Sequence, residues 1–177
     1  MKNHYLLWAT GQDHPGFVAA VTKLLFELRC NLEDSSMMRL GAEFAMFVIF
    51  TADKEVHLEN FSKLNDGPDV SVGLKKISKS QARFTPTAKN PYIVRVHGHD
   101  RPGIVYHVTG SLAKNGFNIT DLSTHRTGEG KNAGYILLLE GELLKKNRLA
   151  PLQRDLRNLE KKLKTRISLA PVQSASL

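Results

Sequence analysis

Two short turns carry the residues best suited to bind a ligand. Residues 13–16 have the sequence Asp-His-Pro-Gly, and residues 100–103 have the sequence Asp-Arg-Pro-Gly. The second motif therefore begins 87 residues after the first. Each turn precedes a predicted helix, whose first N–H groups attract a carboxylate. Glycine lets the backbone approach a ligand closely. The two turns therefore predict a site for a small carboxylate-bearing ligand.

An asparagine stands at the start of the predicted strand that follows each of these helices. The side-chain amide both donates and accepts hydrogen bonds, so it can bind an α-amino or an α-carboxylate group. A structural interpretation competes with this one, because an aspartate before Pro-Gly is also a helix-start signal, with the carboxylate as cap. The candidate ligand-binding residues are Asp13, His14, Gly16, Asn31, Asp100, Arg101, Gly103 and Asn118.

The turns belong to a longer internal repeat. At the same offset Gly11 corresponds to Gly98, Leu25 to Leu112, Asp34 to Asp121 and Arg39 to Arg126. A short insertion, residues 129–132, follows in the second copy. Repeats of this kind indicate one supersecondary unit used twice. The matched arginines and strand aspartates can form ion contacts within each copy, and the sequence gives them no further role.

Hydrophobic periodicity gives both copies the same element order. In the first copy it predicts a strand over 5–10, a helix from residue 15, strands over 31–40 and 43–51, a weaker helix over 54–65 and a strand over 70–77. In the second copy it predicts strands over 92–97, 117–127, 133–140 and 166–169, with helices over 102–114 and 148–164. This βαββαβ order predicts an α+β chain of two tandem ferredoxin-like domains. Each is expected to be a four-stranded antiparallel sheet with two helices on one face.

The expected domains are residues 1–79 and 92–177, with a polar, proline-containing linker over 80–91. Their charges differ. The first 79 residues hold nine Lys/Arg against ten Asp/Glu, whereas the remainder holds 16 against seven. A basic half favours an acidic partner surface or weak nucleic-acid binding through the last helix. Without a helix-turn-helix, a zinc finger or an aromatic platform, sequence-specific DNA reading by this chain is not expected. The basic residues at the C-terminal end are Lys145, Lys146, Arg148, Arg154, Arg157, Lys161, Lys162, Lys164 and Arg166.

The sequence offers no recognisable catalytic motif, and we expect neither an enzyme nor a cofactor. His97 and His99 share one strand face, and His107 follows on the next helix, but a further ligand at a typical metal-site spacing is missing. We therefore expect no metal.

Cysteine usage and hydropathy indicate the cellular compartment of the protein. The single cysteine, Cys30, excludes an intrachain disulfide and is expected to be a small buried apolar residue. The longest apolar run, residues 44–50, is too short to span a bilayer, and the N-terminus does not read as a signal peptide. These features predict a cytoplasmic protein.

The Asp-x-Pro-Gly turn, the helix after it and the Asn-(Leu/Ile)-x-Asp start of the next strand resemble the ACT domain. Two such domains in tandem resemble the glycine cleavage system transcriptional repressor family. The resemblance implies a regulator that responds to a small amino acid, glycine being the suggestion, and that acts through a partner regulatory protein. It also implies a homodimer or higher homo-oligomer, with the effector between the turn and the strand at a domain interface. The alternative is a dimerisation module without a ligand.

Overall fold

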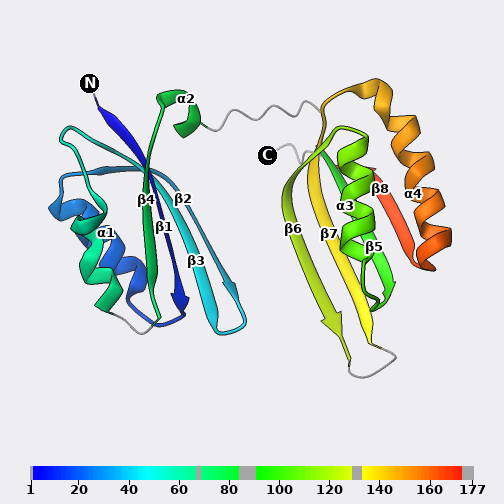
Figure 1. Cartoon of the computed structure of the whole chain (residues 1–177), viewed down its shortest axis with the longest axis horizontal. Helices are drawn as coiled ribbons and strands as arrows, with labels where there is room; N and C mark the ends of the chain where they lie inside the picture. The colour runs from blue at the N-terminus through cyan, green and yellow to red at the C-terminus, as the bar shows by residue number, and fades with distance from the viewer. Residues whose placement is uncertain (1, 67–68, 84–90, 129–132, 173–177) are drawn as a thin grey trace. The chain divides into compact units, whose positions relative to one another are not determined.

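The computed structural model describes residues 2–66, 69–83, 91–128 and 133–172. The chain divides into two compact units, residues 1–85 and 86–177, and each contains one four-stranded sheet (Figure 1). Within the described ranges, none of the helices combines the length and the apolar character that crossing a membrane requires.

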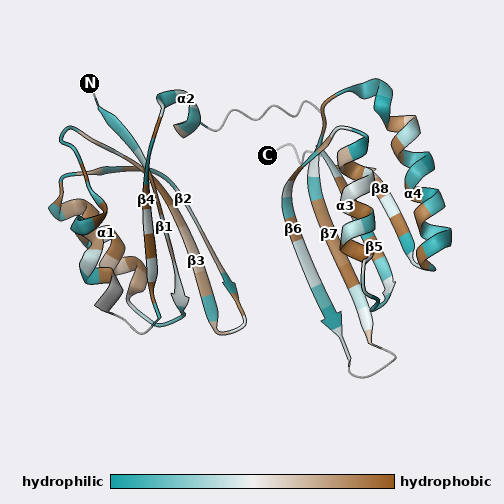
Figure 2. Ribbon diagram, in the orientation of Figure 1, coloured by the Kyte–Doolittle hydropathy of each residue, from teal (hydrophilic) through white to brown (hydrophobic). Residues whose placement is uncertain are grey.

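The first unit has an antiparallel sheet in the order β2-β3-β1-β4. The helices α1 and η1 lie on one face of this sheet (Figure 1), and its central strand β3 is largely apolar (Figure 2). The elements are β1 (Asn3–Gln12), α1 (Phe17–Glu27), β2 (Asn31–Leu40), β3 (Glu43–Ala52), the 3-10 helix η1 (Leu58–Asp66), β4 (Ser71–Ile77) and α2 (Lys79–Ala82).

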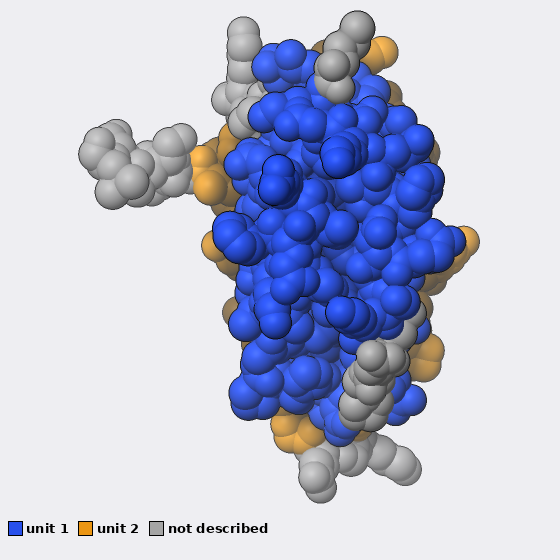
Figure 3. All heavy atoms as spheres, turned by 90° about the vertical axis from the view of Figure 1, so that its left-hand side faces the viewer, with its two compact units in different colours: residues 1–85 blue, residues 86–177 orange. Residues whose placement is uncertain are grey.

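The second unit, orange in Figure 3, repeats the plan with the order β6-β7-β5-β8. Its helix α4 buries Leu152 and Leu156, which confirms the predicted amphipathic helix. The elements are β5 (Pro91–His99), α3 (Ile104–Lys114), β6 (Phe117–Thr127), β7 (Gly134–Leu143), η3 (Lys146–Arg148), α4 (Leu149–Leu163) and β8 (Arg166–Pro171). The tandem ferredoxin-like prediction is confirmed.

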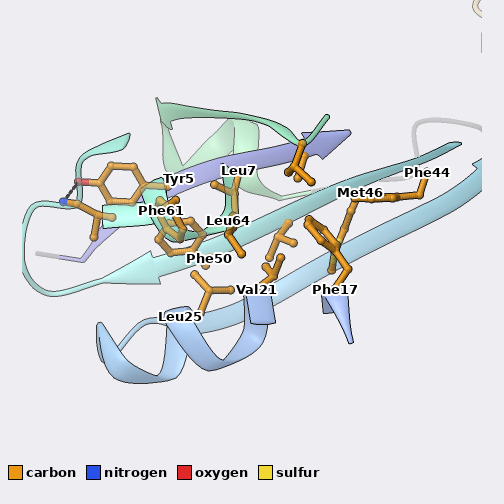
Figure 4. Close-up of a cluster of buried hydrophobic side chains, with 14 of the residues drawn as sticks. Tyr5, Leu7, Phe17, Val21, Leu25, Phe44, Met46, Phe50, Phe61 and Leu64 are labelled. Atoms are coloured by element: carbon orange, nitrogen blue, oxygen red, sulfur yellow. Dashed lines mark hydrogen bonds between the residues drawn. The ribbon is translucent and has the colours of Figure 1, made fainter. Parts of the chain in front are cut away.

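The core of the first unit follows from strand alternation on one side and helical spacing on the other. Alternate residues of β1 and β3 point inward, and α1 contributes one buried residue every turn (Figure 4). The Tyr5 hydroxyl accepts a hydrogen bond from the Val56 backbone N–H at 3.1 Å, inside this core. The side chains packed there include Tyr5, Leu7, Phe17, Phe44, Met46, Phe50 and Phe61.

Several elements differ from the sequence prediction in type or in bounds. The helix expected over 54–65 is a 3-10 helix over Leu58–Asp66, in which Phe61 and Leu64 are buried. The first helix of each unit begins after its glycine, not at the proline. Residues 80–82, the first part of the expected linker, belong to α2 (Lys79–Ala82), and Ala82 is buried. The rest of the expected linker, residues 84–90, lies outside the described ranges.

The outer face of the first sheet accommodates the chain's one tryptophan. Trp8 on β1 pairs with Gly73 on β4, and a Cβ at Gly73 would overlap the Trp8 indole. Any side chain at this position would therefore displace the indole ring. The indole remains 37% exposed.

Candidate ligand-binding turns

The turns before α1 and α3 have the same backbone geometry. Gly16 and Gly103 are the N-caps of the two helices, with φ of 95° and 91° in the left-handed region. Neither helix start has a side-chain cap hydrogen bond. The structural interpretation in which the aspartate caps the helix is therefore wrong. Glycine is favoured at this position because a residue with a Cβ would be strained at this φ.

The turn aspartates instead pair with arginines on the neighbouring edge strand. Asp13 Oδ2 lies 3.4 Å from Arg39 Nη1, and Asp100 Oδ2 lies 3.2 Å from Arg126 Nε. The repeat aligns these two arginines with each other, and the sequence predicts for them no more than an ion contact within each copy. Their shared offset from the turns was the available signal.

Backbone hydrogen bonds hold each turn against its hairpin. The N–H of Asp13 donates to Ala42 O at 2.8 Å, and that of Asp100 donates to Ala133 O at 3.0 Å. The carboxylate is thus fixed in position by its own backbone and by the arginine, while the glycine remains exposed.

Within one unit the asparagine lies at the other end of the sheet from the turn. Asn31 pairs with Thr51, which pairs with His4 at the start of β1, whereas β1 ends at Gln12 just before the turn. The structure therefore does not bring Asp13 and Asn31 together inside the first unit. The same register separates Asp100 from Asn118 in the second unit.

The two asparagines have different surroundings. Asn118 Nδ2 donates to Glu142 Oε1 at 3.3 Å, and Glu142 is buried. The position equivalent to Glu142 in the first unit is Thr51, opposite Asn31. In the second unit the asparagine amide is thus paired with a carboxylate of the protein.

The variable position of the turn is exposed in both units, as His14 and as Arg101. His14 Nδ1 lies 3.1 Å from the Pro15 carbonyl oxygen, and its ring packs edge-on against Phe17 with centroids 5.9 Å apart. The permanent cation at Arg101 makes the second turn more basic than the first.

His107, which the sequence indicates only as a possible metal ligand, lies beside the second turn. His107 lies close to Gly103, with its ring 3.6 Å from the point where a Cβ would stand. The equivalent residue of α1 is Ala20. Among the described residues, no group of three or more His, Cys, Asp or Glu side chains is arranged to hold a metal ion.

Comparison with known proteins identifies both units. ACT-domain family models match residues 3–65 and 92–142, which together make up more than half of the chain. The glycine cleavage system transcriptional repressor of Escherichia coli K12 is 27% identical over 133 residues, covering 74% of this chain and 69% of the repressor. The ACT domain-containing protein ACR8 of Arabidopsis thaliana is 30% identical over 104 residues, covering 56% of this chain and 22% of ACR8.

A solved structure extends the likeness in fold to nearly the whole chain. The crystal structure of an unknown protein from Galdieria sulphuraria superposes with a TM-score of 0.79 at 23% identity, covering 98% of this chain and all of that one. The duplicated turns, the repeated sheet order and the two matched domains agree. The chain carries two ACT domains in tandem and belongs to the ACT-domain family.

Proposed function

We propose that this protein is an amino-acid-responsive regulator of glycine metabolism that acts at the level of transcription through a partner protein. A small amino acid binds where two ACT units meet, and the bound state favours one packing of those units. The observation that carries the proposal is the duplicated turn, in which a left-handed glycine and an arginine-paired aspartate recur. The likeness to the glycine cleavage system transcriptional repressor supports the assignment to glycine metabolism.

The edge strands support a site shared between two copies of the chain. Strand β2 is an edge of its sheet and exposes Leu32, Met37, Met38 and Leu40 by 41 to 75%. An apolar edge with unpaired backbone groups favours pairing with another chain. Antiparallel pairing of two β2 strands would place Asn31 of one chain beside the Leu40 end of the other. That end adjoins Arg39, and hence the Asp13 turn.

We propose different roles for the two units. The Asn118 amide already donates to a carboxylate of the protein, whereas Asn31 faces a threonine. We therefore assign the effector to the first unit, through Asp13, Gly16 and Asn31. The basic second unit is the proposed contact for the partner protein, because a positive surface fits an acidic one.

The test is thermal unfolding of the dialysed full chain with each common amino acid. A ligand at 100 times its Kd adds about 2.7 kcal/mol to the free energy of unfolding. That raises the Tm of a unit of this size by roughly 10 °C or more. Asn31→Ala should abolish the shift, and Asn158→Ala, on an exposed face of α4, should keep it. If no amino acid raises Tm, the sensor proposal fails.

A ligand-free dimerisation module is the second candidate, favoured by the same exposed β2 edge. The variant Gly16→Val distinguishes the two. Loss of the amino-acid response with an unchanged solution mass supports sensing. Loss of the dimer, in a protein that never responded to amino acids, supports a purely structural role.

A further inference from the structure

One corner of the second unit is both hollowed and basic. The hollow measures about 590 Å³ and lies where β5 ends and β8 begins. We call it the β5–β8 corner. Two glycines line it together with His97, His99, Glu160, Lys164, Thr165 and Arg166.

The first unit provides an internal comparison for this corner. In the second sheet His97 pairs with Arg166 and His99 pairs with Gly134. In the first sheet the equivalent pairs are Thr10 with Ser71 and Gln12 with Glu43. The two residues before Arg166 are Lys164 and Thr165, and those before Ser71 are Asp69 and Val70.

At these equivalent positions the two units carry opposite charges. The corner of the first unit holds two carboxylates, Glu43 and Asp69, and no basic residue at the six positions compared. The same positions of the second unit hold Lys164, Arg166 and two histidines, with no carboxylate. Fold alone does not demand these cations, because the first unit forms the same corner without them.

Lys164 is placed at some conformational cost. Its φ of 52° is left-handed, as is the φ of 60° at Asp69. Aspartate adopts this region several-fold more readily than most non-glycine residues. A lysine at the end of α4 also interacts favourably with the helix dipole. That explanation does not extend to His97, His99 and Arg166, which lie on strands.

One lining residue of the corner, Thr165, has a buried hydroxyl that lacks a hydrogen-bond partner among the described residues. Thr165 is 6% exposed, and its Oγ1 has no hydrogen-bond partner in the described part of the chain. An unsatisfied buried hydroxyl is costly. The carboxylate of Glu160 also lines the hollow, and its Oε1 accepts a hydrogen bond from the Ile167 N–H at 3.0 Å.

We propose that the β5–β8 corner binds the phosphate group of a small molecule. Two permanent cations and two histidines suit an oxyanion with about two negative charges, more than a single carboxylate carries. These basic groups all line one hollow of about 590 Å³, a volume that suits a small molecule. The site is distinct from the amino-acid site proposed for the first unit.

The experiment is a titration of the ¹⁵N-labelled full chain with inorganic phosphate at low ionic strength, followed by NMR and calorimetry. We expect saturable shifts at the amides of Gly98 and residues 164–167. His97→Thr and Arg166→Ser restore the residues of the first unit, so each should fold and weaken phosphate binding by about tenfold, which is about 1.4 kcal/mol. The matched control is Arg95→Ser on the same strand and sheet face, outside the hollow. It should leave the phosphate affinity unchanged.

Four results would overturn the proposal. The first is the absence of saturable shifts, and the second is an equal loss of affinity in Arg95→Ser. The third is an oligonucleotide that binds more tightly than phosphate and shifts amides along α4, which would make the surface a nucleic-acid contact. The fourth is displacement of phosphate by glycine, which would make the corner part of an amino-acid site. An amino-acid response without phosphate binding would leave the regulatory proposal standing and remove this one.

Discussion

Arg39 Nη1 lies 3.4 Å from Asp13 Oδ2 and joins the end of β2 to the turn before α1. The second unit repeats the contact between Arg126 and Asp100. Both pairs are substantially exposed, so they add little to stability. Their effect is positional, because each holds the carboxylate of a turn against the end of an edge strand.

Arg39→Ala should therefore separate stability from ligand response. We expect the free energy of unfolding to fall by about 1 kcal/mol or less, while the rise in Tm caused by the amino-acid effector is lost. Urea unfolding and melting with effector measure the two quantities. Lys23→Ala is the control, since it breaks another exposed pair, Lys23–Glu27, away from the turn. A full effector response in Arg39→Ala would refute a positional role.

Two glycines of the second unit should respond to alanine in opposite directions. Gly103 has a φ of 91°, so Gly103→Ala should cost about 1–2 kcal/mol of stability. Gly110 lies inside α3, where a Cβ meets no atom within 4 Å. Gly110→Ala should therefore stabilise the unit by roughly 0.5–1 kcal/mol. Equilibrium unfolding in urea decides both, and destabilisation by Gly110→Ala would contradict the described helix.

Tyr5→Phe should destabilise the first unit through one lost hydrogen bond. The hydroxyl accepts from the buried Val56 N–H, and its removal leaves that donor unpaired. We expect a loss of about 1–3 kcal/mol in the free energy of unfolding. Tyr106→Phe is the comparison, because Tyr106 is 75% exposed on α3. Equal effects of the two substitutions would show that the Tyr5 bond contributes nothing.

Burial raises the pKa of the Cys30 thiol above its ordinary value of 9.0. The folded chain then holds the thiol proton more tightly than the unfolded chain. The corresponding stability is fully present below pH 9 and is lost as the pH rises through the folded pKa. At pH 8 a thiol reagent should modify Cys30 more slowly in the folded protein than in urea, since only the thiolate reacts. Equal rates in the two states would contradict the raised pKa.

The repeat made most of the fold predictable, because each copy supported the assignment of the other. The stripe through Leu152 and Leu156 identified α4 from spacing alone. The helix η1 was harder to predict, since one contact three residues apart, Phe61 to Leu64, does not separate a 3-10 helix from an α-helix. At the candidate site the sequence selected the turns. The contact of Asp13 with Arg39 depends on how the β2–β3 hairpin folds back onto β1, with β3 beside β1 and β2 at the edge, which residue types do not reveal.

Trp8 gives tryptophan fluorescence to the first unit and not to the second. Its indole rests against Gly73 in the first unit, and the second unit has no tryptophan. Tandem domains need not unfold together, and a single melting curve can merge their transitions. Tryptophan emission therefore reports on one half of the intact protein, and circular dichroism reports on both. The difference between the two signals gives the coupling between the units without cutting or labelling the chain.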